Sequence, residues 1–94
     1  MTTTHPKVTE LHDLALQYDE AAARAHSVEA AVDRRQGAVL LRFVAAKCHP
    51  TEPTPTDLDA LRLWSTAGRN MLGVYDTVDM DQINADRAAR RNLK

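Results

Sequence analysis

Apolar residues recur every three or four positions over two long stretches of the chain, and a proline-rich segment separates them. The first stretch runs from Pro6 to Lys47 and the second from Asp57 to about Val78. This spacing places the apolar side chains on one face of an α-helix. The pattern predicts an all-α fold, an antiparallel helical hairpin with helices over about 6–47 and about 57–78 and a turn over 48–56.

Residues that favour helix ends support these boundaries. Pro6 suits the first turn of a helix, where its missing N–H costs nothing. Thr56, with Asp59 three residues later, predicts the N-cap of the second helix. Asp79 and Gln82 repeat that spacing, and they predict a separate short tail helix over about 79–92.

Two weak points interrupt the first predicted helix. Gly37 lies inside it, and glycine costs about 1 kcal/mol relative to alanine in a helix interior. The other weak point is His26-Ser27, so a kink or short break near Ala25 to Val28 stays open as an alternative. A continuous helix, at a rise of about 1.5 Å per residue, would be roughly 60 Å long and would outreach a second helix of roughly 30 to 35 Å.

The composition predicts a thin core for such a hairpin. Apolar residues make up 44% of the 94 residues, but fifteen of them are alanines, which add more helix propensity than buried area. The run from Val39 to Val44 is apolar on nearly every side, and two helices alone do not cover it. We therefore expect a homo- or heterodimer with another helical hairpin protein, assembled as a coiled coil or helical bundle. The residues expected at that interface are Val39, Leu40, Phe43, Val44, Leu61, Trp64 and Met71.

Charge and targeting signals exclude several classes of partner. The formal net charge of −1 gives no general attraction to nucleic acid or to an anionic membrane, so we expect no nucleic-acid partner. The basic end, which comprises Arg87, Arg90, Arg91 and Lys94, fits a helix C-terminus, where cations complement the helix dipole. No window approaches the roughly 20 apolar residues of a membrane span, and the first residues lack the apolar core of a signal peptide.

The residues that carry chemistry predict neither a catalytic nor a metal site. Along a continuous first helix, His5 and His12 would lie some 50 to 60 Å from Cys48 and His49, too far for shared coordination. No Gly-rich phosphate loop, paired-carboxylate pattern or His-Glu metal motif is present. We therefore expect no enzyme activity, no catalytic residues, no metal and no cofactor. A single cysteine also excludes an internal disulfide.

A tyrosine and an aspartate near the end of the second helix form the most specific local pattern. Tyr75 and Asp79 are four residues apart, so they share a helix face one turn apart, where a second protein could bind ring and charge together. For Tyr75 and Trp64, packing in the core is the simpler interpretation. Chance alone gives a Tyr-x-x-x-Asp pair in a chain of this composition roughly one time in four, so the pattern needs support from the rest of the sequence.

With that support, the chain resembles the type VII (ESX) secretion substrates of actinobacteria: a helical hairpin of this length, Tyr75-x-x-x-Asp79 near its end, no signal peptide and balanced charge. Residues 8–22 are similar to the first helix of the EspC-like excreted proteins. The Trp-x-Gly family fits less well, because the turn carries Cys48-His49-Pro50 and Trp64 has no glycine two residues later.

The resemblance implies a non-enzymatic protein that is secreted without a cleaved signal peptide. It also implies that Tyr75 and Asp79 form a secretion signal, which the export ATPase binds after pairing has presented both side chains on an exposed strip. The alternative from another class is a cytoplasmic or phage-type adaptor that regulates a partner protein or, as a weaker alternative, DNA.

Overall fold

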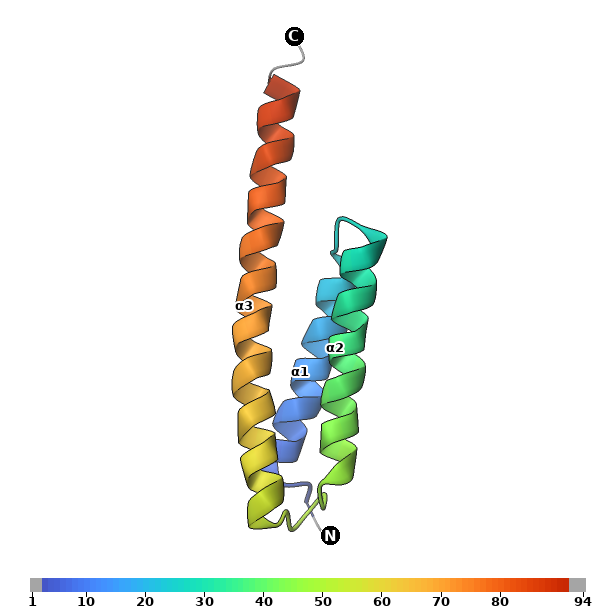
Figure 1. The fold of residues 1–94 in the computed structure, drawn as a ribbon, viewed down its shortest axis with the longest axis vertical. Helices are drawn as coiled ribbons and strands as arrows, with labels where there is room; N and C mark the ends of the chain where they lie inside the picture. The colour runs from blue at the N-terminus through green and yellow to red at the C-terminus, as the bar shows by residue number, and fades with distance from the viewer. Residues whose placement is uncertain (1–2, 92–94) are drawn as a thin grey trace.

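Three α-helices form the fold in the computed structural model, which describes residues 3–91. They are α1 (Pro6–Ala23), α2 (Val28–Lys47) and α3 (Pro55–Arg91). The first two form an antiparallel hairpin, and α3 runs along it and continues beyond its upper end (Figure 1). The prediction of an all-α fold that contains a helical hairpin is confirmed, and the molecule is elongated, with a longest dimension of 63 Å.

The chain reverses direction inside the first predicted helix, so the prediction of one helix over 6–47 is wrong. Ser27 explains where α2 begins: its backbone is extended, and its hydroxyl accepts a hydrogen bond of 3.1 Å from the N–H of Ala30. A serine in this role satisfies one of the free N–H groups at a helix start. The weak point near Ala25 to Val28 is therefore a complete turn between two antiparallel helices.

The second predicted helix, which is α3, begins at Pro55, two residues earlier than predicted. The cap is Thr54 rather than Thr56, because the Thr54 hydroxyl accepts a hydrogen bond of 3.1 Å from the N–H of Asp57. In return, the Asp57 carboxylate accepts one of 3.1 Å from the N–H of Thr54. These reciprocal bonds form a capping box, and hydrogen bonds from the backbone of Thr54 and His49 lower the pKa of Asp57.

No boundary separates residues 78 and 79, so the predicted tail helix over 79–92 is wrong as a separate element. The third helix is continuous over 37 residues. Asp79 does not cap a helix, because its carboxylate binds Arg34 in α2. Residue 92, the predicted end of the tail helix, lies outside the described residues.

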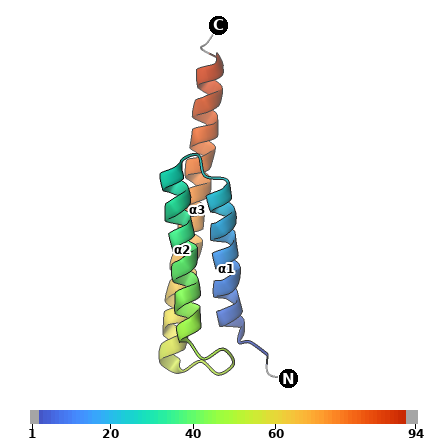
Figure 2. The same cartoon turned by 90° about the vertical axis from the view of Figure 1, so that its right-hand side faces the viewer.

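The core lies where all three helices run side by side. Leu11 of α1, Leu41 of α2 and Leu61 of α3 are each at most 2% exposed, and together they form its centre. Burying a side chain of this size stabilises the fold by about 1.5 to 3 kcal/mol. Figure 2 shows α1 and α2 side by side in front of α3, whose last turns rise above the connection between them. None of the described helices has both the length and the apolar character that a membrane crossing requires.

Candidate functional site

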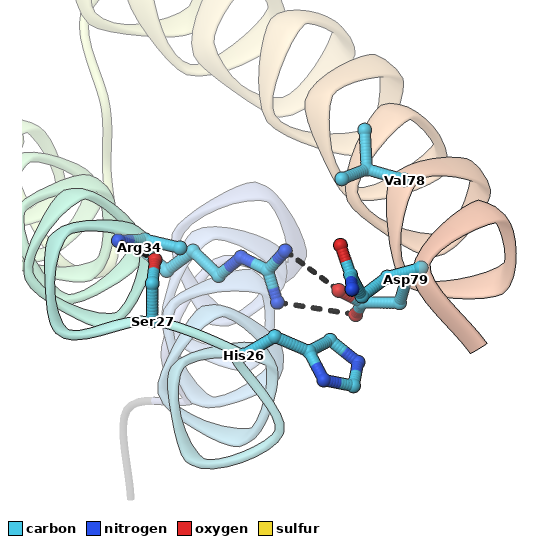
Figure 3. Close-up of a pocket in the computed structure, with 7 residues that line it drawn as sticks. His26, Ser27, Arg34, Val78 and Asp79 are labelled. Atoms are coloured by element: carbon cyan, nitrogen blue, oxygen red, sulfur yellow. Dashed lines mark hydrogen bonds and ion pairs between the residues drawn. The ribbon is translucent and has the colours of Figure 1, made fainter. Parts of the chain in front are cut away.

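Tyr75 and Asp79 both lie on the side of α3 that contacts α2, and both bind the same residue, Arg34. The Asp79 carboxylate accepts two hydrogen bonds from the guanidinium, of 2.9 Å from Nη2 and 3.1 Å from Nη1 (Figure 3). The guanidinium carbon lies 4.5 Å from the centre of the Tyr75 ring. The shared helix face agrees with the sequence pattern. In the single chain the Asp79 side chain is only 15% exposed, so the exposed strip that we expect after pairing stays a prediction.

Arg34 joins the three helices at one point. Its side chain is 3% exposed, and Nη1 also donates a hydrogen bond of 2.8 Å to the carbonyl of Ala21, in the last turn of α1. The negative end of the α1 dipole and the Asp79 carboxylate both favour a cation here. Arg34 Nε has no hydrogen-bond partner in the described part of the chain. A buried arginine that lost Asp79 would therefore keep a charge with little compensation.

Tyr75 has a second set of contacts that fixes its orientation. Its hydroxyl donates a hydrogen bond of 3.2 Å to Asp33, and its ring packs edge-to-face on Tyr18 with the ring centres 5.7 Å apart. Burial, together with the charge of Asp33, raises the pKa of Tyr75 to about 12. The hydroxyl is therefore protonated at neutral pH and acts as a donor. Hydrogen bonds from Arg34 lower the pKa of Asp79, which is ionised at neutral pH.

A small hollow of about 220 Å³ opens beside this cluster, between the start of α2 and the upper part of α3. Arg34 and Asp79 line it together with His26 and Ser27 (Figure 3). Gln82 also lines it. The hollow is at a helix N-terminus and next to an arginine, a combination that suits an anion. Asp79 already supplies that negative charge, so the site is satisfied by the chain itself.

The predicted interface residues separate into three groups. Val39, Leu40, Phe43 and Met71 are between 44% and 62% exposed, as an interface with a second chain requires. Val44 and Trp64 are partly buried against the core. Leu61 has no exposed surface. The assignment of Leu61 to the interface is therefore wrong, because α1 folds back and covers it.

Three of these exposed apolar residues, Leu40, Phe43 and Met71, border a groove between α2 and α3. Leu40, Phe43, Val44 and Trp64 line a hollow of about 390 Å³ near the lower end of the two helices. Trp64 also lines a second hollow of about 180 Å³, together with Met71. Val39 lines neither of these hollows. The groove therefore has apolar walls from both helices.

α3 carries a second apolar stripe, which we call the outer stripe. The apolar spacing in the sequence did not distinguish this stripe from the face of α3 that packs on the core. Its residues follow steps of three, four, three and four positions, and this is the spacing by which helices pair in coiled coils. Met71, Val74 and Val78 in it are 44%, 53% and 53% exposed. The outer stripe comprises Trp64, Ala67, Met71, Val74 and Val78.

The predicted separation of the histidines from the cysteine is wrong, because α1 lies antiparallel to α2. The N–H of His5 donates a hydrogen bond of 2.8 Å to the carbonyl of Pro50. The rings of His5 and His49 accept hydrogen bonds from nearby backbone N–H groups, so both serve as local caps. Within residues 3–91, no group of three His, Cys, Asp or Glu side chains is arranged to hold a metal ion. Burial raises the pKa of the Cys48 thiol, which opposes a role as a nucleophile.

The basic end lies on the part of α3 beyond the hairpin. Arg87, Arg90 and Arg91 are exposed there, and Lys94 lies outside the described residues. No protein-family model, curated protein or solved structure matches the chain.

Proposed function

We propose that this protein is a non-enzymatic interaction module, exported as a type VII (ESX) secretion substrate or as the paired partner of one. The observation that carries the proposal is the apolar surface along α2 and α3. Phe43 is 55% exposed and Leu40 48% exposed beside a groove, and the outer stripe continues this surface along α3. A contiguous apolar patch of this kind on a small protein is typical of a binding surface.

The shape of that surface favours a helical partner. The groove lies between two helices, and the three-and-four spacing of the outer stripe matches the side-chain spacing of a neighbouring helix. The partner we propose is a helical hairpin protein, either a second copy or a related chain. Pairing would remove from water the apolar side chains that the thin core leaves exposed.

Tyr75 and Asp79 are the proposed secretion signal, and the secretion ATPase is their proposed reader. Support comes from their spacing, from their place in the second half of α3, and from the resemblance of the chain to EspC-like proteins. A catalytic role is disfavoured by the same geometry. Asp79 accepts two hydrogen bonds from Arg34, and the Tyr75 hydroxyl, with a pKa of about 12, stays protonated at neutral pH and so cannot act as a base there.

Export of variants from a host with an active type VII system tests the signal. We expect Tyr75→Ala and Asp79→Asn to remain in the cells while the wild-type protein reaches the medium. Asp76→Asn is the matched control, because Asp76 is a highly exposed carboxylate on the same helix and outside the pattern. Circular dichroism of each purified variant shows whether it folds. Normal export of both folded variants would refute the signal, and a wild-type protein that stays in the cytoplasm would favour the adaptor alternative.

Pairing is tested separately by light scattering of the purified protein, alone and with a candidate hairpin protein encoded beside it. Met71→Glu should abolish the pairing, because it places a charge in the middle of the outer stripe. Thr66→Glu is the control, since Thr66 is exposed on the same helix and lies outside that stripe, five positions before Met71. Equal masses for wild type and Met71→Glu under all conditions would contradict a pairing role for this surface.

A further inference from the structure

The third helix consists of two parts that are held in different ways. Its lower part, residues 55–72, packs on the core through Leu61 and Gly68, and the Gly68 carbonyl accepts a hydrogen bond of 2.9 Å from the Tyr18 hydroxyl. Its upper part, residues 74–91, first runs beside the upper end of the hairpin and then extends past it (Figure 1). We call this upper part the arm. Its closest polar contacts with the hairpin are those of Tyr75 and Asp79.

Gly73 separates the two parts and weakens the helix between them. A Cβ atom at this position would meet nothing within 4 Å in the described structure, so close packing does not require a glycine. Glycine in a helix interior costs conformational entropy and lowers helix stability. The Thr77 hydroxyl also donates a hydrogen bond of 3.1 Å to the Gly73 carbonyl, and this type of bond is often found where helices bend. Gly73 therefore weakens α3 in the turn directly below Tyr75.

Arg34 is the principal anchor of the arm. It holds Asp79 by two charge-assisted hydrogen bonds while it contacts the ring of Tyr75. The other ion pair of the arm, between Arg24 and Asp76, has an N–O distance of 3.7 Å, and its side chains are 59% and 72% exposed. Exposed pairs of that kind contribute little to stability. The other contacts of the arm are the packing of the Tyr75 ring on Tyr18 and its hydrogen bond to Asp33. Loss of Arg34 should therefore loosen the arm while the lower part of α3 stays on the core.

We propose that the arm is a movable segment with its hinge at Gly73, and that Arg34 holds it closed by binding Tyr75 and Asp79. In the closed state, the two side chains are engaged inside the protein. In the open state, both are free for a second protein. A protein that recognises Tyr75 and Asp79, which we call the reader, must therefore compete with Arg34 for them. This second step rests on the proposed function, which the inference deepens.

The closed contact also describes the chemistry of such a reader. Arg34 offers a planar cation to the Asp79 carboxylate, and Asp33 offers an acceptor to the Tyr75 hydroxyl. A protein surface that replaces these contacts needs an arginine or lysine beside a hydrogen-bond acceptor, about one helical turn apart. We therefore infer that the reader presents a basic residue to the arm.

Hydrogen exchange on the full-length protein tests the closed state. In Arg34→Met, we expect the amides of residues 74–80 to exchange about tenfold faster or more. Their hydrogen bonds lie within α3, so their exchange rate is set by how often the helix unfolds locally once the arm is released. The amides of residues 57–68 should keep their wild-type rates. Arg35→Met is the matched control, since Arg35 is exposed on the same helix. Unchanged rates in the arm, or equal acceleration over all of α3, would overturn the proposal.

Two further variants keep the test decisive if Arg34→Met does not fold. Asp79→Asn removes the charge of the anchor and should also accelerate exchange in the arm alone. Gly73→Ala should slow that exchange by up to about fivefold, because it strengthens the hinge without a steric clash. A Gly73→Ala variant with wild-type exchange in the arm would exclude Gly73 as the hinge.

The export assay separates this inference from the proposed function. If Arg34→Met is exported at least as well as wild type and Asp79→Asn is retained, both the closed state and the signal are supported. Fast exchange in Arg34→Met together with normal export of Tyr75→Ala and Asp79→Asn would support the movable arm and refute the signal. Retention of Asp79→Asn in the cells, together with unchanged exchange in Arg34→Met, would support the signal and refute the movable arm.

Discussion

The substitution Gly37→Ala tests how closely α1 and α2 approach each other. A Cβ atom on Gly37 would lie 2.5 Å from both Cδ2 and Cε2 of the Tyr18 ring, well inside the usual carbon–carbon contact of about 3.5 to 4 Å. The ring has little freedom to move away. It is 5% exposed, its hydroxyl donates a hydrogen bond to the Gly68 carbonyl, and the ring packs edge-to-face with that of Tyr75.

Two opposing effects determine the change in the free energy of unfolding. Alanine favours the helix over glycine by about 1 kcal/mol. Forcing an extra carbon into a packed core costs about 1 to 3 kcal/mol, and loss of the buried Tyr18–Gly68 hydrogen bond adds about 1 kcal/mol. The net effect of Gly37→Ala should be destabilisation by about 1 to 3 kcal/mol, a large fraction of the total stability of a domain of this size.

Urea unfolding followed by circular dichroism measures this change, and the other two glycines provide controls. Gly73→Ala should stabilise the protein by about 0.5 to 1 kcal/mol, because its Cβ would meet nothing within 4 Å in the described structure. Gly68→Ala should be nearly neutral, since its nearest contact would be an ordinary 3.5 Å. In a Tyr18→Ala background, Gly37→Ala should become stabilising. A Gly37→Ala protein as stable as wild type would refute the steric argument.

Three other predictions concern the core and the Arg34 cluster, and each is measured by chemical or thermal unfolding. Arg34→Met and Asp79→Leu should each lower the free energy of unfolding by about 2 to 4 kcal/mol. In the double variant neither charge is left unpaired, so its total loss of stability should be at least about 1 kcal/mol smaller than the sum of the two single losses. Arg34 lowers the pKa of Asp79 in the folded protein, so the pair stabilises the fold fully above the unfolded pKa of about 3.9. This contribution should disappear as the pH falls through the lower pKa of the folded state. Asp79→Asn should therefore flatten the dependence of the free energy of unfolding on pH in this range. Leu61→Ala should cost about 2 to 5 kcal/mol, whereas Met71→Ala, at a position that is 44% exposed, should cost the isolated chain less than about 1 kcal/mol.

Local sequence patterns were sufficient to predict that the chain is helical, but they misplaced the helix ends. Thr54 and Thr56 are each followed three residues later by an aspartate, so both fit the same capping pattern. The structure uses Thr54 with Asp57, and a pattern of residue types alone does not distinguish the two. The error of two residues has no effect on the predicted fold.

The turn between α1 and α2 was harder to predict because the apolar spacing continues across it. Ala22, Ala25 and Val32 keep the steps of three and seven residues that a continuous helix would show. The signal that identifies the break is Ser27 with Glu29 in the first turn after it, a favourable helix start. Its consequence is large, because the reversal brings α1 alongside both α2 and α3 and buries Leu61.

The Arg34 cluster could not be predicted without that turn. An arginine in an amphipathic helix is normally assigned to the solvent face, and a separation of 45 positions between Arg34 and Asp79 gives no local pattern. Once α2 lies beside α3, the two side chains meet. Asp79 then has a structural role that accounts for an acidic residue at this position, independently of any secretion signal.

The double variant Arg34→Met with Asp79→Leu separates these two roles of Asp79. It replaces a buried ion pair by apolar side chains, a change that is often neutral or stabilising, so we expect a folded protein. If the carboxylate itself is recognised during export, this folded variant should remain in the cells as Asp79→Asn does. If Asp79 serves only to compensate the charge of Arg34, the double variant should reach the medium at wild-type levels. That outcome would refute the signal while the closed contact would still explain why Tyr75 and Asp79 lie on one face of the helix.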